Sequence, residues 1–383
     1  MGAALFCMST NMTGSLLPEL MTDYEMHLDS GGMMSLFQYL GCIMAVLLMT
    51  KFADRMRKQI LLILALAVVA ATQFLIGGFP PFVLFMVLYL IMGAGLGAFD
   101  TLNNAVVNDL YSENRNAVLS IMHAICSAGA AFIPIFSVMV GTTNWETTYR
   151  TVALIITAIA VMQIVTYMFG KHQIVPSLEN RENAVDKKRA EKKEGAGALK
   201  DSRIWVCVLS MFFFGMCQSG VTIWCVKYCR DVFSGAGVFE CALSLSLYWL
   251  GALICRFAVG LVPRLKIASS KGLIVWGGIL GAAALLAGVL TGNYIGFLVG
   301  VFVMGILNGA SLPRAIALMT GWYPDRSAFT AGISYIALYL AYAFIPLLMG
   351  VVASAFGMQI MMVIPVIGTL VSGLIGLKLP NGE

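Results

Sequence analysis

The sequence predicts an all-α membrane protein in which twelve transmembrane helices form two pseudo-symmetric six-helix bundles. Of the 383 residues, 60% are hydrophobic and only 11% are charged, and apolar segments recur along the whole chain. Soluble domains are about 45–50% apolar and about 25% charged. The apolar segments are about 20 residues long, which is enough to cross a hydrocarbon core of about 30 Å as a helix. In a helix each segment satisfies its own backbone hydrogen bonds, as lipid requires.

The first six predicted helices are separated by joints that contain helix breakers or charges. In order, these are a Gly-Gly pair at 31–32, a basic loop at 51–58, a Gly-Gly and Pro-Pro turn at 77–81, and two loops that carry Arg115 and Arg150. The resulting spans are 2–22, 33–50, 59–77, 82–108, 117–140 and 151–170.

The last six predicted helices follow the same logic. Their joints contain Lys227 and Arg230, Pro263 with a basic loop after it, a Gly-Asn pair at 292–293, and Pro324. The spans are 204–226, 240–262, 271–291, 294–322, 328–354 and 357–378.

A charged segment that is poor in aromatic residues, 171–203, separates the sixth span from the seventh. Such a composition is typical of a solvated linker. The predicted domains are therefore an N-terminal six-helix bundle, 1–170, a cytoplasmic linker, 171–203, and a C-terminal six-helix bundle, 204–383.

Lysine and arginine are distributed unequally between the two sides of the membrane. With the linker placed inside, the inside loops and the C-terminus hold 19 of the 24 basic residues, and the outside loops hold 3. Because cytoplasmic loops carry the excess of Lys and Arg, both termini are predicted to be cytoplasmic. We expect a multi-pass protein of a cell membrane, specifically a bacterial cytoplasmic membrane. The net charge of +5 follows from this bias and does not indicate nucleic acid binding.

The two halves of the chain resemble each other. Ala-Phe-Ile-Pro occurs in the fifth and the eleventh span, so that Pro134 and Pro346 lie 212 positions apart, and Arg115 and Arg326 lie 211 apart. Since each half has six spans, the second half keeps the orientation of the first. A parallel repeat of this kind places substrate sites at the interface between the repeats, near the middle of the membrane.

Asp100 interrupts the apolar fourth span. It lies nine residues before Asp109, and Asn104 and Asn108 follow it on one helix face. Nine residues are ~13 Å of helix, which places Asp100 near the middle of the membrane. A carboxylate at that depth costs on the order of 2.5–3.5 kcal/mol on insertion scales and normally faces a cavity or a partner. The polar face of this span therefore predicts a site inside the bundle.

Span ten contains a basic counterpart, Arg314, at a similar depth, with Asn308 nearby. Asp100 and Arg314 are then expected to face a common cavity from opposite halves. Two purely structural roles stay open. In the first, Asp100 and Arg314 form a permanent ion pair that joins the halves. In the second, Arg314 extends its charged group toward the membrane surface.

His123 is the only histidine within a predicted span. It either packs as a hydrogen-bonded side chain or binds substrate and relays protons, because a histidine ordinarily titrates near pH 6.5. Other polar and aromatic residues at cavity depth are weaker candidates for substrate binding, since aromatic residues in spans more often pack or lie at the interface. They are Asn11, Gln38, Gln218, Trp224 and Tyr339.

The stretch TKFADRMRKQ resembles the cytoplasmic motif between the second and third helices of the major facilitator superfamily, with Asp54, Arg55 and Lys58 in register. GALICRFAVG is similar to the C-terminal counterpart of that motif, around Arg256. The resemblance covers essentially the whole chain. It implies the major facilitator fold, alternating access, and a gating role for these four residues.

The pattern DTLNN followed by LSIMHAICSAGAAFIP resembles the fucose:proton symporter branch and the related sodium-dependent glucose transporter-like proteins. This resemblance implies that Asp100 is the cation-coupling group and that Asn104 and His123 bind substrate. The fucose carrier has a second acid where this chain has Gly14. Either Asp100 therefore couples alone, or the coupling ion is sodium.

Together these features predict a secondary active transporter that couples symport of a small polar solute, most simply a monosaccharide, to H⁺ or Na⁺. One alternative is an organic anion, such as a sugar acid, held by Arg314. A drug:proton antiporter is less favoured, because the fifth span lacks the Gly-Pro-x-x-Gly-Gly element typical of that class.

An enzyme is disfavoured, since the sequence contains no nucleophile–base constellation, phosphate loop or metal-ligand cluster. We expect a monomer in the lipid bilayer with a small-molecule substrate. We expect no nucleic acid partner, no metal and no cofactor besides the coupling ion.

Overall fold

The computed structural model describes residues 2–52, 57–110, 115–141, 144–169, 200–261, 269–323 and 327–380. Within these ranges the chain is helical and has no β-strand. The helices before the linker are α1 (Gly2–Ser15), α2 (Leu17–Asp23), α3 (Leu28–Gly31), α4 (Met33–Phe52), α5 (Lys58–Ile76), α6 (Phe82–Leu110), α7 (Arg115–Gly141) and α8 (Trp145–Phe169). Those after it are α10 (Ser202–Val232), α11 (Val238–Leu261), α12 (Ser270–Leu290), α13 (Tyr294–Asn308), α14 (Ser311–Trp322), α15 (Ser327–Phe356), α16 (Met358–Met361) and α17 (Val363–Gly376).

Eleven helical segments of the described residues are long and apolar enough to cross a membrane. The first predicted span is a further segment, formed by α1 and α2, with a kink at Leu16. Pro18 has no N–H and so removes one helical hydrogen bond. The helix nevertheless continues, because Leu16 N donates to the Met12 carbonyl at 2.9 Å and Leu20 N donates to the Leu16 carbonyl at 3.0 Å. The predicted all-α membrane fold is confirmed.

Two helices are longer than predicted. α8 begins six residues earlier than expected, and α10 ends six residues later. α10 accommodates its charged end because Lys227 pairs with Asp231 one turn further on, at 2.6 Å, and Arg230 pairs with Glu19 of α2. Hydropathy locates the apolar part of a helix and does not register a polar end that is stabilised by such pairs.

Span ten is broken at Gly309 and Ala310, between α13 and α14. Pro313 has no N–H, so the helix itself offers no amide donor to the Gly309 carbonyl. That carbonyl accepts a hydrogen bond from Arg256 Nε at 3.0 Å. The break therefore supplies a backbone acceptor for the Arg256 side chain of α11 inside the bundle.

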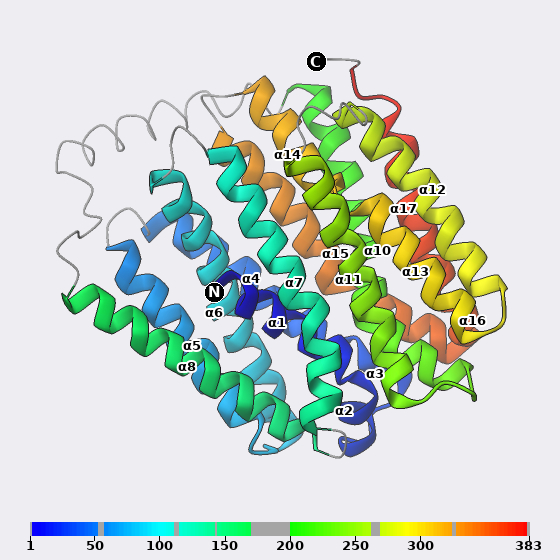
Figure 1. Ribbon diagram of the computed structural model, residues 1–383, viewed down its shortest axis with the longest axis horizontal. Coiled ribbons are helices and arrows are strands. Elements are labelled where there is room, and N and C mark those ends of the chain that lie inside the picture. Colours follow the sequence, from blue (N-terminus) through cyan, green and yellow to red (C-terminus); the bar gives the residue numbers. More distant parts are fainter. Residues whose placement is uncertain are drawn as a thin grey trace.

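The two halves stand side by side in Figure 1, α1–α8 in blue to green and α10–α17 in green to red. They meet where α7 packs along α11, where α3 and α4 pack against α15, and where α1 and α2 pack against α10. We call the end at which α8 finishes and α10 begins the linker end, and the opposite end the far end. Most of the predicted linker, 171–203, lies outside the described residues, so the domain limits stay predictions.

A polar cluster at the linker end joins the start of α10 to the end of α14. Asp201 caps α10 by accepting from Arg203 N at 2.9 Å, and its carboxylate pairs with the Arg203 guanidinium at 2.7 Å. Tyr323 OH also donates to this carboxylate at 2.8 Å, and the Arg203 guanidinium lies 5.2 Å from the centre of the Trp322 ring. The hydrogen bonds from Arg203 lower the pKa of Asp201 to about 2.

Candidate functional site

Asp100 of α6 is the centre of a polar cluster between the two halves. Its Oδ1 accepts from Asn104 Nδ2 at 3.0 Å, and its Oδ2 accepts from Tyr339 OH at 2.8 Å. Asn104 Nδ2 also donates to the Asp100 carbonyl at 2.9 Å. Because Tyr339 belongs to α15, the Asp100 carboxylate connects the two halves of the chain.

Asp100 lies deep in the bundle but is not sealed. It is the nineteenth of the 29 residues of α6, and Tyr339 is the thirteenth of the 30 residues of α15, so the pair is near the middle of both helices. Asp100 and Asn104 are only half-buried. An ionisable group at membrane depth normally faces the bundle interior or a water-filled cavity. Asp100 points across the interface between the halves, where its carboxylate meets Tyr339 of α15.

Tyrosine side chains of α4 and α15 form a row beside Asp100. The ring of Tyr39 lies 5.8 Å from that of Tyr339 and 4.8 Å from that of Tyr342. Tyr335 continues the row, 6.1 Å from Tyr339. These rings offer apolar faces and hydroxyl groups side by side, a combination that suits a ligand with both C–H and O–H surfaces.

Arg256 of α11 brings a positive charge to the interface between the halves. Its Nη1 donates to the His123 carbonyl at 3.2 Å and to Ser127 Oγ, both in α7. Its Nε donates to the Gly309 carbonyl, and the Trp249 ring centre lies 5.8 Å from the guanidinium carbon. Arg256 is half-buried. The residue expected to act in gating thus reaches the central region and joins α11 to α7.

Arg314 does not pair with Asp100. Within the described ranges no acidic side chain lies within ion-pair distance of Arg314 or Arg256. The Asp100 carboxylate accepts from Asn104 and Tyr339 instead. Of the roles left open by the sequence, a permanent Asp100–Arg314 ion pair is therefore not what the structure contains.

His123 and Asn11 lie next to the Arg256 region. His123 is half-buried, and its carbonyl accepts from both Arg256 and Ser127 Oγ, the latter at 3.0 Å. Asn11 of α1 is 5% exposed, and its Oδ1 accepts from Trp249 Nε1 at 2.8 Å. Asn11 thereby joins the first helix to α11 through the same tryptophan that lies beside Arg256.

Two residues predicted to bind substrate, one in each half, pack inside their own half. Gln38 Oε1 accepts from Thr13 Oγ1 at 3.0 Å within the N-terminal half. Asn308 Nδ2 donates to Thr369 Oγ1 at 2.8 Å within the C-terminal half. Both side chains are 1% exposed. In the part of the chain that the structure describes, neither residue contacts Asp100 or Arg256.

Gln218 and Trp224 are also fully buried, in α10. Trp224 Nε1 donates to the Pro346 carbonyl at 3.0 Å, which joins α10 to α15 toward the far end. Gln218 Oε1 has no hydrogen-bond partner among the described residues. Of the two aromatic residues predicted to bind substrate, Tyr339 therefore lies beside Asp100, and Trp224 packs between α10 and α15 instead.

The predicted gating loop is only partly described. Asp54 and Arg55 lie outside the described residues, and Lys58 is the first residue of α5. Beside it, Arg57 Nη1 donates to Tyr167 OH at 2.7 Å, which joins the start of α5 to the end of α8. The gating role of Asp54, Arg55 and Lys58 stays a prediction.

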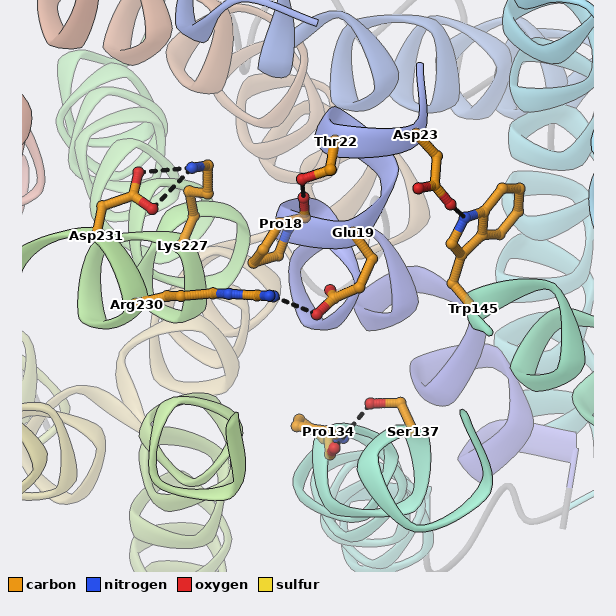
Figure 2. A network of polar contacts seen from close by, with 10 residues as sticks. All are labelled: Pro18, Glu19, Thr22, Asp23, Pro134, Ser137, Trp145, Lys227, Arg230 and Asp231. Atoms are coloured by element: carbon orange, nitrogen blue, oxygen red, sulfur yellow. Dashed lines mark hydrogen bonds and ion pairs between the residues drawn. The ribbon is translucent and has the colours of Figure 1, made fainter. Parts of the chain in front are cut away.

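At the far end, α2 lies between α10 and α8 (Figure 2). Glu19 of α2 pairs with Arg230 of α10. On the other side of α2, Asp23 Oδ2 accepts from Trp145 Nε1 of α8 at 2.6 Å. One short helix is thus fixed to both halves by its two carboxylates.

Two glycines bring the backbones of the halves into direct contact near this end. A Cβ on Gly14 would lie 1.8 Å from the Thr222 carbonyl oxygen, and a Cβ on Gly32 would lie 2.3 Å from Leu347 N. We call these two contacts, together with the Glu19–Arg230 ion pair, the far-end seam. Any other residue at either glycine must separate the halves, because 1.8 and 2.3 Å are far below a van der Waals contact.

Sequence reasoning missed three partners of Arg256. Ser127 and Trp249 are single residues in apolar spans, and nothing in their spacing distinguishes them from packing residues. Gly309 carried a usable signal, because a glycine four residues before Pro313 leaves a carbonyl without its helical donor.

Comparison with known proteins supports the fold. The family model of the Major Facilitator Superfamily matches residues 1–271. No curated protein sequence matches the chain. The fold is similar to that of a bacterial homologue of the human lysosomal transporter Spinster in an inward-facing and occupied conformation, with a TM-score of 0.77 and 13% identity over 98% of this chain and 94% of that chain.

The fold is also similar to that of the E. coli fucose:proton symporter, with a TM-score of 0.69 and 19% identity over 99% of this chain and 97% of that chain. A structure of that transporter in the outward conformation gives a TM-score of 0.67 and 18% identity over 100% and 99% of the two chains. The family match covers more than half of the sequence, and the fold agrees over nearly all of it. This chain is a multi-pass membrane transporter and not an enzyme, and it belongs to the Major Facilitator Superfamily.

Proposed function

We propose that this transporter is a symporter in which a cation bound at Asp100 drives the uptake of a small polar solute. The observation that carries the proposal is the position of Asp100. Its carboxylate lies near the middle of the bundle and accepts from Tyr339 OH across the interface at 2.8 Å, and the residue is half-buried.

The physical reason is the cost of enclosing a charge. An ionised carboxylate needs water or a counter-charge at membrane depth, and so it opposes closure of a site that it faces. A proton or a sodium ion at Asp100 removes the net charge and allows the halves to close around the solute. Tyr339 contacts Asp100 from the opposite half, so the state of the carboxylate bears directly on how the halves meet. Either H⁺ or Na⁺ can serve as the coupling ion, and no other cofactor is required.

We infer that the structure represents the state open at the linker end. The far-end seam is closed, while Asp100, Asn104 and Arg256 in the middle are half-exposed. The excess of basic loop residues on the linker side supports a cytoplasmic position for that end and for both termini. We accordingly propose an inward-facing monomer in a bacterial cytoplasmic membrane.

The fold and the residues around Asp100 favour a monosaccharide as the substrate class. Asn104 and the tyrosine row beside Asp100 supply the amide, hydroxyl and ring surfaces that a sugar requires. His123 is half-buried in α7, beside the Arg256 contacts, and its side chain is a further candidate for substrate binding. The similarity to the fucose:proton symporter supports the same class.

One alternative substrate class has an observation in its favour. Arg256, which reaches α7 across the interface, and Arg314 have no acidic partner in the described ranges, which suits an organic anion such as a sugar acid. A drug:proton antiporter has no comparable support, because the fifth span lacks the element typical of that class.

Reconstitution in proteoliposomes tests the proposal. Labelled hexoses and hexuronates are offered with an inward pH gradient, an inward sodium gradient, or neither. We expect at least one of these solutes to accumulate above its external concentration with one of the two gradients, and accumulation to stop when an ionophore abolishes that gradient. Equilibration at the same rate with and without gradients would contradict coupled symport.

A further inference from the structure

Arg256 and Arg314 are two half-buried arginines with no acidic partner among the described residues. Arg256 lies where α11 meets α7, and its acceptors are Ser127 Oγ and the carbonyls of His123 and Gly309. Positive charges inside a membrane bundle are costly unless water, an acid or a bound anion stabilises them. The described residues therefore include no negative group that balances the charge of either arginine.

The Arg256 guanidinium lies deep in the bundle. Helical side chains tilt toward the N-terminus of their helix, so Arg256 reaches from the linker end of α11 toward its middle. Its partner Ser127 is the thirteenth of the 27 residues of α7, at the centre of that helix. Ser127 Oγ and the carbonyls of His123 and Gly309 are all neutral acceptors. They position the guanidinium without cancelling its charge.

Asp100 is not the missing partner. Its two oxygens accept from Asn104 and Tyr339. One turn after Asp100, Asn103 Nδ2 of α6 donates to Met122 Sδ of α7 at 2.9 Å, and the carbonyl of the next residue, His123, accepts from Arg256. A solute that contacts Asp100 and its neighbours is thus near a positive charge that has no acidic partner among the described residues.

We propose that Arg256 binds the carboxylate of the transported solute, which makes the substrate a sugar acid. The inference rests on the proposed symport function and narrows its substrate class. Guanidinium groups bind carboxylates through charge-assisted, often bidentate hydrogen bonds. Ser127 and the Trp249 ring fix the orientation of Arg256.

This assignment also explains why a cation at Asp100 promotes substrate binding. A substrate carboxylate is repelled by an ionised Asp100 and attracted by Arg256. A proton or sodium ion at Asp100 removes the repulsion and leaves the attraction, so cation and anion bind together more readily than either binds alone. Coupling then follows from the charges of the site.

The test measures equilibrium binding to the purified full-length protein with two matched pairs of probes, glucose with glucuronate and galactose with galacturonate. We expect at least one acid to bind about 30-fold or more tightly than its neutral partner. Arg256→Gln should weaken binding of the acid by about 30-fold or more, and Arg256→Lys by less, because lysine keeps the charge but not the planar donor pair. Arg150→Gln, at an exposed arginine of α8, should leave binding unchanged.

Equal binding of acid and neutral sugar, or undiminished acid binding in Arg256→Gln, would overturn the inference. Cation-coupled uptake of the neutral sugar would still uphold the proposed function. Binding of glucose 6-phosphate in preference to both acids would also reject a carboxylate. If Arg256→Gln does not fold, the wild-type preference within each pair and the effect of Arg256→Lys decide the question. Failure of all four probes to bind or to be transported would count against this inference and the proposed function together.

Discussion

Replacing Gly14 by alanine should open the far-end seam. The new methyl group would lie 1.8 Å from the Thr222 carbonyl oxygen of α10, and 3.0 Å from the Ile223 Cα. An ordinary van der Waals contact is about 3.5–4.0 Å, so α1 and α10 must separate by more than 1 Å. Because both neighbours are backbone atoms, no side-chain rotation relieves the clash.

The expected magnitude follows from this overlap. Forcing an extra methyl group into a packed interface typically costs about 1–3 kcal/mol. The cost arises only when the far end is closed, since the two helices part when it opens. A differential cost of this size shifts a two-state equilibrium about 5- to 150-fold toward the far-end-open state.

Distances between spin labels at Glu25 and Ser234 measure this shift. Both residues are exposed at the far end, one in each half. Gly14→Ala should raise the population of the longer distance severalfold. Gly332→Ala is the matched control, because it makes the same change inside α15 where a Cβ meets nothing within 4 Å. If the two variants give the same distance distribution as the wild type, the close backbone contact does not hold the seam and the reasoning is wrong.

Two further predictions concern ion pairs. Arg230→Gln should raise the far-end-open population by about fivefold or less, because the Glu19–Arg230 pair is partly exposed and worth about 1 kcal/mol or less, and the same labels measure it. Asp201→Asn should lower the melting temperature in detergent at pH 7. A pKa of about 2, below the ordinary value, means that ionised Asp201 adds stability above about pH 4 that is lost as the pH falls through about 2. The contribution is about 1 kcal/mol or less, since Arg203 is 48% exposed. Equal melting of variant and wild type at pH 7 would contradict it.

Most of the fold could be predicted because hydropathy depends on local sequence. The ends of most spans were located within two residues. The errors fall where tertiary contacts decide. α10 is longer because Arg230 pairs with Glu19 of the other half. Span ten breaks at Gly309, because Pro313 supplies no amide donor there and Arg256 Nε donates to the Gly309 carbonyl instead.

The site was harder to predict, because its geometry is a property of how the halves meet. Asp100 could be recognised from a carboxylate in an apolar helix, but its partner Tyr339 is 239 positions away. Depth alone suggested Arg314 as the opposing cation. In the structure Arg256 is the arginine that is hydrogen-bonded across the interface to α7, and spacing along one helix contains neither the direction of a long side chain nor its acceptors.

The account depends most on Asp100 as the cation-coupling residue. Transport by Asp100→Asn in proteoliposomes tests it directly, with Asp29→Asn, at an exposed far-end acid, as the control. We predict that Asp100→Asn abolishes accumulation driven by the H⁺ or Na⁺ gradient and retains exchange of solute across the membrane, while the control behaves as the wild type. Accumulation by Asp100→Asn at the wild-type level would contradict the account.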